Sequence, residues 1–421
     1  MLGLLNLALL AVLVAMLYGP VSRQITILGV LRHPAPLVLA EGQGFYKIED
    51  TMQCEDLHYW SPTNKVFAVC EDSVLPRFKW FPPVGNFEGP ATTTGSIHVI
   101  DPQTMKASRL AFENFAGPFV THGFDVIEDP ETPNAVYIFA VNHLSNPDFY
   151  QAAAVGEDVP RARSQVELFH HVLESSTARH VRSIRNPLIA TPNDIYAESP
   201  NSFFVTNDHL YRTGYKRMIE DVLPLAKWSS TIHVQIHDFN AEDAAAGIDA
   251  TVALTGLYNN NGLGHGKTKD EMLVVSCMGG TLYRAHANSG NHTITLGDAI
   301  RPGGQFDNPS YYSDPYRTAS HDASGYVLGG MARPVDLAKH HSDPAAKDGA
   351  IVFYVRPKSG SGAAATEWES RVIFQDDGTL IRTASSAVLV PIETQTGQKK
   401  KAWLFVSGFF SESVIAVEVE L

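Results

Sequence analysis

The sequence predicts an all-β fold, a six-bladed β-propeller with an N-terminal apolar helix and a covering helix. After residue 40 the chain is a succession of short β-rich runs separated by turn signals, which is typical of sandwiches, barrels and propellers. No repeat is visible in the sequence, so length decides between these architectures. A single sandwich rarely needs ~380 residues, whereas six four-stranded blades of roughly 50–60 residues do. The clearest runs are Val66 to Val69, Ser96 to Ile100, Val136 to Val141, Thr231 to Ile236, Met272 to Ser276, Ile351 to Val355 and Val414 to Val419.

The first 22 residues differ in character from the rest of the chain. They carry no charged side chain, and Leu2 to Tyr18 is almost wholly apolar. This length is near the lower limit for a transmembrane helix and long for the apolar region of a signal peptide. We therefore expect residues 1–22 to be a signal peptide or an uncleaved signal anchor. The segment has no convincing small-x-small cleavage site, which favours the anchor. Residues 23–421 are predicted to form the propeller.

Two features of the sequence bear on the compartment, and they conflict. Arg23 and Arg32 follow the apolar segment, which by the positive-inside rule favours a cytoplasmic body. Asn291-His292-Thr293 is a glycosylation sequon, which favours a lumenal or secreted body. We favour the secretory route, with the protein membrane-anchored through its N-terminus or secreted.

The covering helix is predicted over Tyr215 to Trp228. Its apolar residues fall near helical spacing, with charged residues between them, and Pro224 is expected to kink or end the helix. It is either a short helix packed over one end of the β body or an amphipathic lid or membrane-facing element.

Charge and cysteine content exclude several functions. Asp and Glu number 45 against 32 Lys and Arg, a net charge of −13, which argues against nucleic acid as the partner. The three cysteines contain no Cys-x-x-Cys, which disfavours zinc or redox chemistry. Cys54 and Cys70 flank one predicted hairpin, where a disulfide and two free thiols are equally compatible with the sequence. No Gly-x-Ser-x-Gly is present, so a nucleophile elbow is absent.

Oxygen-bearing side chains stand at four predicted strand–loop boundaries, and their separations suit different blades. In a propeller such loops can converge on the central channel, although four unrelated polar turns would give the same pattern. Carboxylate and amide oxygens suit Ca²⁺, which takes about six to eight such ligands. Because neighbouring residues of a strand face opposite sides, the second member of a pair could serve a second, deeper ion. The residues are Glu55, Asp56, Asn193, Asp194, Asn261, Asp307 and Asn308.

Two histidines complete the candidate site. His122 lies in Val120-Thr121-His122-Gly123-Phe124, and His143 ends the run Ala140 to His143. A lone histidine is more often a packed residue than a base. Here the two stand at ends of successive strands, so one could orient the other as a general base.

In this order the pieces resemble the serum paraoxonase/arylesterase family. The matching stretches are Glu55-Asp56-Leu57, His122-Gly123-Phe124, Asn142-His143, Asn193-Asp194-Ile195, Thr206-Asn207-Asp208-His209, Asn261-Gly262-Leu263 and Asp307-Asn308. The resemblance implies a six-bladed propeller that holds two Ca²⁺ ions, one catalytic and one structural. It also implies residue roles: Glu55, Asn193, Asn261, Asp307 and Asn308 at the catalytic ion, Asp56, Asp194 and the Phe124 carbonyl at the structural ion, His122 as base and His143 as its partner.

The activity implied by the resemblance is calcium-dependent hydrolysis of lactones and of aryl or carboxylic esters. The chain departs from the family in one respect: the family's disulfide joins the N-terminal region to a cysteine near the C-terminus, whereas the last cysteine here is Cys277. Ring closure is therefore expected to depend on strand pairing. Two other interpretations stay open, a single-metal propeller lactonase of the gluconolactonase type and a non-enzymatic, calcium-stabilised propeller that binds a partner or a membrane.

Overall fold

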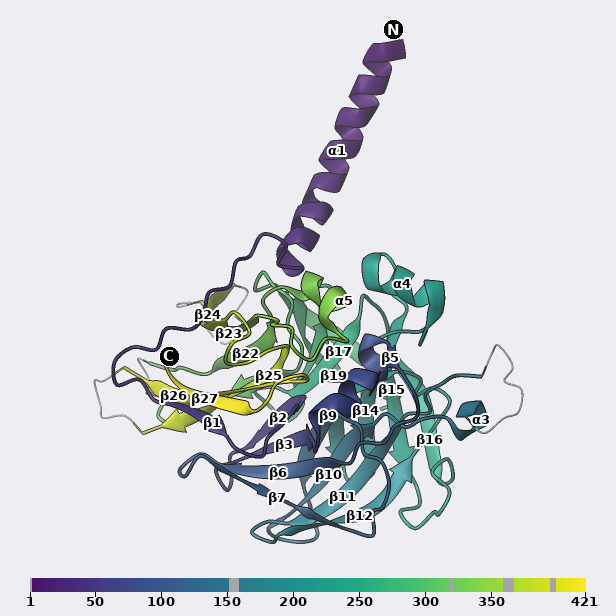
Figure 1. Ribbon diagram of the computed structural model, residues 1–421, viewed down its shortest axis with the longest axis vertical. Coiled ribbons are helices and arrows are strands. Elements are labelled where there is room, and N and C mark those ends of the chain that lie inside the picture. The colour runs from purple at the N-terminus through teal and green to yellow at the C-terminus, as the bar shows by residue number, and fades with distance from the viewer. Residues whose placement is uncertain (1, 151–158, 319–320, 359–366, 394–398) are drawn as a thin grey trace.

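The structure, a computed structural model, describes residues 2–150, 159–318, 321–358, 367–393 and 399–421. In these ranges the strands form six sheets of four or five strands and one two-stranded ribbon, β4 (Trp80–Phe81) with β5 (Asn86–Phe87). The six sheets are the blades of a propeller (Figure 1). The predicted six-bladed architecture is thus confirmed.

Each blade is built from strands that follow one another in the chain, except that the β4–β5 ribbon interrupts blade 1 and the first strand of the chain completes the last blade. Blade 1 contains β2 (Asp56–Trp60), β3 (Lys65–Glu71), β6 (Gly95–Asp101) and β7 (Lys106–Arg109). Blade 2 contains β8 (Ala111–Glu113), β9 (Thr121–Glu128), β10 (Ala135–Asn142), β11 (Gln165–Val172) and β12 (Thr177–Ile184). Blade 3 contains β13 (Pro192–Ser199), β14 (Ser202–Asn207), β15 (Ser229–Ile236) and β16 (Ile248–Leu257).

The second half of the ring follows the same plan. Blade 4 contains β17 (Asn260–His265), β18 (Met272–Ser276), β19 (Thr281–Ala287) and β20 (Ile294–Ile300). Blade 5 contains β21 (Pro309–Tyr312), β22 (Gly325–Met331), β23 (Ala350–Pro357) and β24 (Trp368–Asp376). Blade 6 contains β25 (Ala384–Ile392), β26 (Lys401–Gly408), β27 (Val414–Glu420) and β1 (Phe45–Ile48).

The innermost strands form a closed ring. Strands β2, β9, β13, β17, β21 and β25 each contact the next in this order, and β25 returns to β2. These strands line the central channel, so residues at their N-terminal ends face a common space.

Six apolar clusters hold the ring together, one between each pair of neighbouring blades. Between blades 2 and 3, for example, the rings of Phe139 and Phe203 lie 5.2 Å apart and both side chains are fully buried. Because both faces of each blade are covered, the strands carry continuous runs of apolar residues. A seventh cluster, around Phe78, Trp80, Phe81 and Phe410, lies at one end of the channel.

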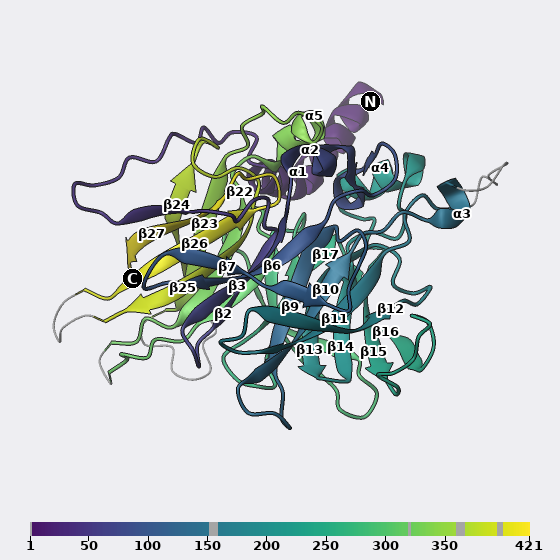
Figure 2. The same cartoon turned by 60° about the horizontal axis from the view of Figure 1, so that its bottom comes forward.

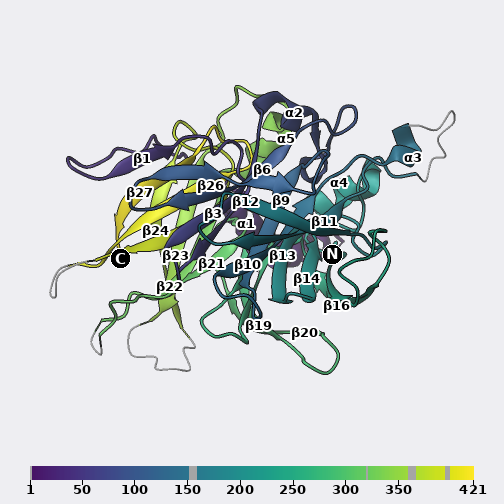
Figure 3. The same ribbon diagram turned by 90° about the horizontal axis from the view of Figure 1, so that it is seen from below.

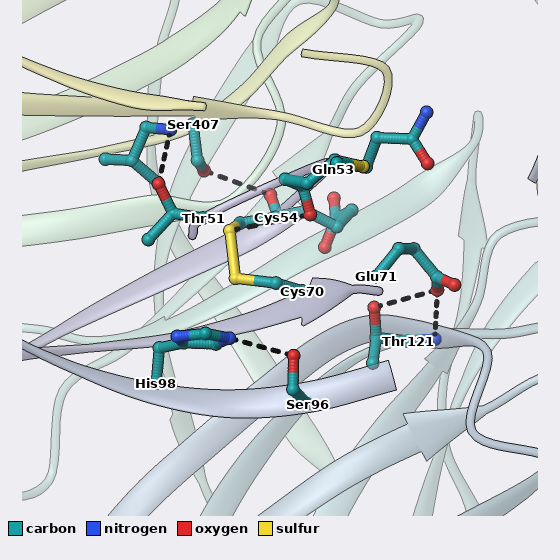
Figure 4. Close-up of a disulfide and its surroundings, with 12 residues drawn as sticks. Thr51, Gln53, Cys54, Cys70, Glu71, Ser96, His98, Thr121 and Ser407 are labelled. Carbon is teal, nitrogen blue, oxygen red and sulfur yellow. Dashed lines mark hydrogen bonds between the residues drawn. A yellow bond between two sulfur atoms is a disulfide. The ribbon is translucent and has the colours of Figure 1, made fainter. Parts of the chain in front are cut away.

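Antiparallel pairing of β1 with β27 closes the ring, from Phe45↔Val417 to Ile48↔Val414. Figure 3 shows β1 beside the C-terminal strands. The expectation that closure depends on strand pairing is confirmed. Cys54 and Cys70 form a disulfide, which lies within blade 1 and joins no distant parts of the chain (Figure 4).

The helices gather at one end of the propeller. Near this end lie α2 (Val74–Lys79), α4 (Gly214–Val222) and α5 (Leu337–His340), and α1 (Leu2–Ile27) leaves the body there (Figures 1 and 2). The remaining short helices are α3 (Pro147–Tyr150), η1 (Pro82–Val84) and η2 (Pro334–Asp336).

Helix α4 is the predicted covering helix, and it ends before Pro224 as expected. Its apolar residues Tyr215, Met218 and Val222 are exposed, whereas Glu220 is buried. Glu220 accepts hydrogen bonds from the Leu210 and Tyr211 amides at 2.8 and 2.9 Å, so a charged side chain anchors the helix on the body.

The base of α1 is docked on blades 4 and 5. The Arg23 guanidinium donates to the Gly279 carbonyl and to Thr281 Oγ1, and Arg32 donates to the Ala332 carbonyl. Both arginines therefore have structural roles at this junction. Among the described residues, none of the helices combines the length and the apolar character needed to cross a membrane.

Candidate metal and catalytic centre

Three inner strands are irregular where the candidate residues stand. The register of β9 against β10 shifts between Thr121 and Phe124, that of β13 against β14 between Pro192 and Ile195, and that of β17 against β18 between Asn260 and Leu263. Such β-bulges redirect side chains and are common beside functional sites. The simple alternation expected at Asn193 and Asp194 is thus replaced by a bulge that leaves both residues buried.

Two glycines allow the inner strands to approach closely. A Cβ atom on Gly123 would lie 2.4 Å from Asp194 Oδ1, and one on Gly262 would lie 2.6 Å from the Asp307 carbonyl oxygen. Neither position has room for a side chain. The glycines that follow His122 and Asn261 are therefore required by the contact between blades 2 and 3 and between blades 4 and 5.

Hydrogen bonds connect candidate residues from different blades. Asn308 Nδ2 lies 3.1 Å from both carboxylate oxygens of Glu55, which links blades 5 and 1. The Leu263 amide donates to Asp194 Oδ2 at 2.7 Å, which links blades 4 and 3. Ser385 Oγ donates to the Glu55 carbonyl. The structure thus brings together residues that lie more than 250 positions apart in the sequence.

Four of these residues are buried carboxylates that repel one another. Burial and then the neighbouring acids Asp307 and Asp56 raise the pKa of Glu55 well above its usual range. Burial and then Asp56 do the same to the pKa values of Asp194 and Asp307. Burial raises the pKa of Asp56 to about 6. A bound cation would remove this repulsion and keep the acids ionised.

Four buried oxygens of this cluster have no hydrogen-bond donor among the described residues. They are Oδ1 of Asn193, Asn261, Asp307 and Asn308. A buried polar atom without a partner costs about 1–3 kcal/mol, so four in one cluster indicate a missing electropositive partner. Together with the Glu55 carboxylate they are a hard-oxygen set, which fits Ca²⁺.

Asp56 and Asp194 have a different environment, in which backbone amides meet the carboxylates. Asp56 Oδ1 accepts from the Leu57 amide at 2.7 Å, and Asp194 Oδ1 accepts from the Ile195 amide at 2.8 Å. The Phe124 amide lies 3.5 Å from Asp56 Oδ2. Phe124 is therefore adjacent to Asp56, and the two acids form a second group within the cluster.

The two histidines are in direct contact. His122 Nδ1 lies 3.1 Å from His143 Nε2, and His143 Nδ1 lies 2.9 Å from Ser164 Oγ. His122 Nε2 points the other way and lies 4.0 Å from Glu55 Oε1. Burial lowers the pKa of His122 to about 3 and the pKa of His143 well below its usual range. Both rings are therefore neutral at neutral pH, the form that can accept a proton.

Sequence reasoning missed the residues that hold the histidines in place. The Phe81 ring packs edge-on against the rings of His122 and His143, at 5.3 and 6.0 Å. Trp80 Nε1 donates to the His143 carbonyl at 2.7 Å, and the Arg77 guanidinium lies 4.1 Å above the Phe81 ring. Arg77 is fully buried, although the sequence around it, with Lys79 two residues later, does not distinguish it from a surface arginine.

Glu71 fixes the segment that precedes His122. Its carboxylate accepts hydrogen bonds from the amide and hydroxyl of Thr121, at 2.9 and 3.2 Å (Figure 4). Arg77 Nη1 lies 3.8 Å from the same carboxylate and donates to the Gln53 carbonyl at 2.5 Å. Blade 1 thereby positions the start of β9, which carries His122.

A pocket opens beside the histidine pair. His143, Ser164 and Asp208 line it together with prolines of the β4–β5 region and two arginines, Arg212 and Arg217. Asp208 is paired with His209 at 3.0 Å, and Arg217 with Asp221 at 3.2 Å. Arg212 donates to the Ala190 carbonyl at 2.7 Å and has no carboxylate within ion-pair distance in the described part of the chain.

Fold and site together define the class: a six-bladed propeller whose channel holds a cluster of buried acids and amides beside a histidine pair. Residues 80–258 match the family model described as Arylesterase. The resemblance inferred from the ordered motifs is thereby confirmed.

Curated relatives give the same result over a shorter stretch. The chain is 35% identical over 100 residues to serum paraoxonase/arylesterase 1 of Homo sapiens, and 31% identical over 100 residues to serum paraoxonase/arylesterase 2 of Gallus gallus. Each alignment covers 24% of this chain and 23% of the relative, so the chain aligns with about a quarter of the relatives' length. Among solved structures, a luciferin-regenerating enzyme aligns with 89% of this chain and 95% of its own, at 10% identity and a TM-score of 0.47.

Proposed function

We propose that the protein is a calcium-dependent hydrolase of lactones and of aryl or carboxylic esters. The observation that carries this proposal is the group of four unpartnered oxygens, on Asn193, Asn261, Asp307 and Asn308, beside Glu55 and the His122–His143 pair. The match of residues 80–258 to the Arylesterase family supports hydrolysis as the type of reaction.

Two sets of residues would hold the metal. Glu55, Asn193, Asn261, Asp307 and Asn308 would hold a catalytic Ca²⁺, and Asp56, Asp194 and the Phe124 carbonyl a structural one. When bound, the catalytic ion would polarise the substrate carbonyl and stabilise the negative charge that develops on its oxygen. The burial of Asp56 and Asp194, together with their raised pKa values, favours two ions over the single-metal alternative.

The two histidines would accept the proton that the attacking water releases. His122 Nε2 faces Glu55 and accepts a proton from the attacking water, while Nδ1 is directed at His143. The negative charge of Asp208 favours the protonated His122 ring. His143 holds the His122 ring in orientation and is itself held by Ser164. Water attack on the carbonyl opens a lactone to a hydroxy acid, or an ester to an acid and an alcohol, with no covalent enzyme intermediate.

The test is a panel of lactones and aryl esters assayed with and without Ca²⁺, for the natural chain and for His122→Gln. We expect hydrolysis only with Ca²⁺, and a loss of about 10²–10⁴-fold in kcat for His122→Gln. Calcium binding by the variant, measured by titration calorimetry, should stay close to that of the natural chain.

Each alternative predicts a distinct result. A non-enzymatic propeller would hydrolyse nothing in the panel, and His122→Gln would change no measured property. A single-metal lactonase would bind one tight calcium ion per chain. Full activity of His122→Gln would show that the proton is transferred elsewhere.

A further inference from the structure

Asn142 stands directly before His143 and connects the two chain segments that carry the histidine pair. Its Oδ1 accepts from the Val120 amide at 3.0 Å, and its Nδ2 donates to the Pro118 carbonyl at 3.1 Å. The Val120 carbonyl in turn accepts from the His143 amide at 3.0 Å. One side chain therefore ties the backbone ahead of His122 to the backbone ahead of His143.

These hydrogen bonds are made where the strand ladder is interrupted. Ala140 pairs with Phe124 and Asn142 with Thr121, so β9 has one residue more than β10 between the two pairs, and His122 lies in this bulge. A β-bulge disrupts the ladder locally and leaves its extra residue unpaired. The Asn142 side chain therefore supplies contacts between β9 and β10 that the ladder lacks beside His122.

The Asn142 amide is itself held by Glu167 of β11. Glu167 Oε1 accepts from Asn142 Nδ2 at 2.8 Å and from Gln165 Nε2 at 2.7 Å. Glu167 Oε2 lies 3.0 Å from His180 Nε2 and accepts from Ser183 Oγ at 2.6 Å. Asn142 and Glu167 are each 1% exposed. Burial opposes ionisation of Glu167, but the four hydrogen bonds outweigh it and lower the pKa of this carboxyl group.

An equivalent asparagine in blade 3 has no such carboxylate. Asn207, at the end of β14, accepts from the Ala190 and Thr191 amides, both at 2.8 Å. Its Nδ2 donates to the Leu188 carbonyl at 2.8 Å and to Ser230 Oγ at 3.2 Å. No carboxylate stands among these partners in the described ranges. The buried acid thus distinguishes the asparagine of the blade that carries both histidines.

We propose that Asn142 and Glu167 are positioning residues for the histidine pair. Glu167 fixes the orientation of the Asn142 amide, and Asn142 fixes the backbone of both histidines, so that His122 Nδ1 stays 3.1 Å from His143 Nε2. Neither Asn142 nor Glu167 lines the pocket beside the pair, so each acts through the histidines. The inference rests on the proposed function, in which the His122 ring accepts a proton. Misplacing a reacting group by about 1 Å can cost about 10²-fold in rate.

The kinetic test exchanges the hydrogen-bonding roles of the two side chains. In Asn142→Asp two carboxylates face each other and their hydrogen bond is lost. When Glu167→Gln is added, the amide introduced at 167 can donate to the carboxylate introduced at 142. We expect kcat for an aryl ester to fall about 10²-fold in the single variant, with KM and calcium affinity unchanged, and to recover at least about tenfold in the double variant. Asn201→Asp, the same change at an exposed position, is the control and should match the natural chain.

A second measurement needs no substrate. In the Ca²⁺-loaded protein with ¹⁵N-labelled histidine, the proton between His122 Nδ1 and His143 Nε2 should give one downfield NMR signal coupled to both nitrogens, absent from His122→Gln. We expect Asn142→Asp to lose this signal and the double variant to regain it. The Tm rise caused by Ca²⁺ should be the same in the natural chain, both Asn142 variants and the control, which shows that they are folded.

The two measurements separate failure of this inference from failure of the proposed function. A natural chain that hydrolyses no ester would refute the proposed function, and the NMR signal would still decide whether Asn142 positions the pair. An unchanged signal in Asn142→Asp, or no recovery in the double variant, would overturn the inference. An equal loss of calcium affinity and kcat would also overturn it, because the damage would then be structural.

Discussion

A buried carboxylate is stable only where something offsets the loss of its hydration, and Glu55 and Asp307 have little in the protein to do this. Arg77 lowers the pKa of Glu55, but burial and the acids Asp307 and Asp56 outweigh it. A bound metal ion would supply the positive charge that offsets the burial and mutual repulsion of these acids. The same residues must therefore destabilise the metal-free protein and stabilise the loaded one.

The variant Asp307→Asn tests whether this carboxylate destabilises the metal-free protein and stabilises the metal-loaded one. In chelator the variant should unfold at a Tm equal to or above that of the natural chain, because one repelling charge is gone. With Ca²⁺ the order should reverse, and calcium affinity should fall at least about tenfold. Scanning calorimetry in chelator and in calcium measures both, with the exposed Asp270→Asn as control. A variant less stable than the natural chain under both conditions would contradict the charge argument.

Arg212 gives a prediction about substrate charge. Its guanidinium lines the pocket beside His143 without a carboxylate partner among the described residues, and burial lowers its pKa. A substrate that carries a negative group would supply the partner. Arg212→Gln should raise KM about tenfold for a carboxylate-bearing aryl ester and leave KM for its neutral analogue unchanged. An equal change for both esters would show that Arg212 only shapes the pocket.

At the scale of single residues, the sequence predicted the acids, amides and histidines because each stands in a local motif at a strand end. It did not predict Arg77, Phe81 or Trp80, because their part in the site arises from contacts made only in the folded chain.

At the scale of elements, His209 makes one of the contacts that join α4 to the body. His209 lies between Asp208, at 3.0 Å, and Asp221 of α4, also at 3.0 Å. Burial opposes protonation of His209, yet Asp208 outweighs it and, with Asp221, raises the pKa of this ring. When protonated, the ring pairs with both carboxylates and holds the helix over the pocket.

The pH dependence of this contact follows from the sign of the shift. Because the pKa of His209 is higher in the folded than in the unfolded chain, its stabilisation is complete below about pH 6.5 and is lost as pH rises through the folded value. His209→Gln should lower the free energy of unfolding by about 1.5–3 kcal/mol at pH 6 and by less at pH 9. Urea unfolding at both pH values measures this. A difference that grows with pH would mean that the shift has the opposite sign.

The elements themselves were well predicted, because alternating turn signals and β-rich runs mark them in the sequence. The end of α4 before Pro224 was also predictable, because proline lacks the amide hydrogen that a helix interior requires. The bulges at Pro192–Ile195 and Asn260–Leu263 were not, because they arise where neighbouring blades crowd together. They are the local irregularities that place the candidate ligands in the channel.

At the scale of the whole molecule, the ring is closed at two levels. The six apolar clusters and the β1–β27 pairing hold the blades at their faces and at the ends of the chain. The candidate metal ligands would hold the inner strands of blades 1, 3, 4 and 5 at the centre. The number of blades could be predicted from the chain length and the number of strands. The pairing of β1 with the last blade could be seen only in the tertiary structure.

The most direct test of this account is thermal unfolding of the full chain in chelator and in Ca²⁺, together with a count of tightly bound calcium. The account predicts two calcium ions per chain and a Tm that is markedly higher with calcium than in chelator, because metal that binds only the folded state stabilises it by mass action. The same Tm in chelator and in calcium, with no calcium bound, would contradict it.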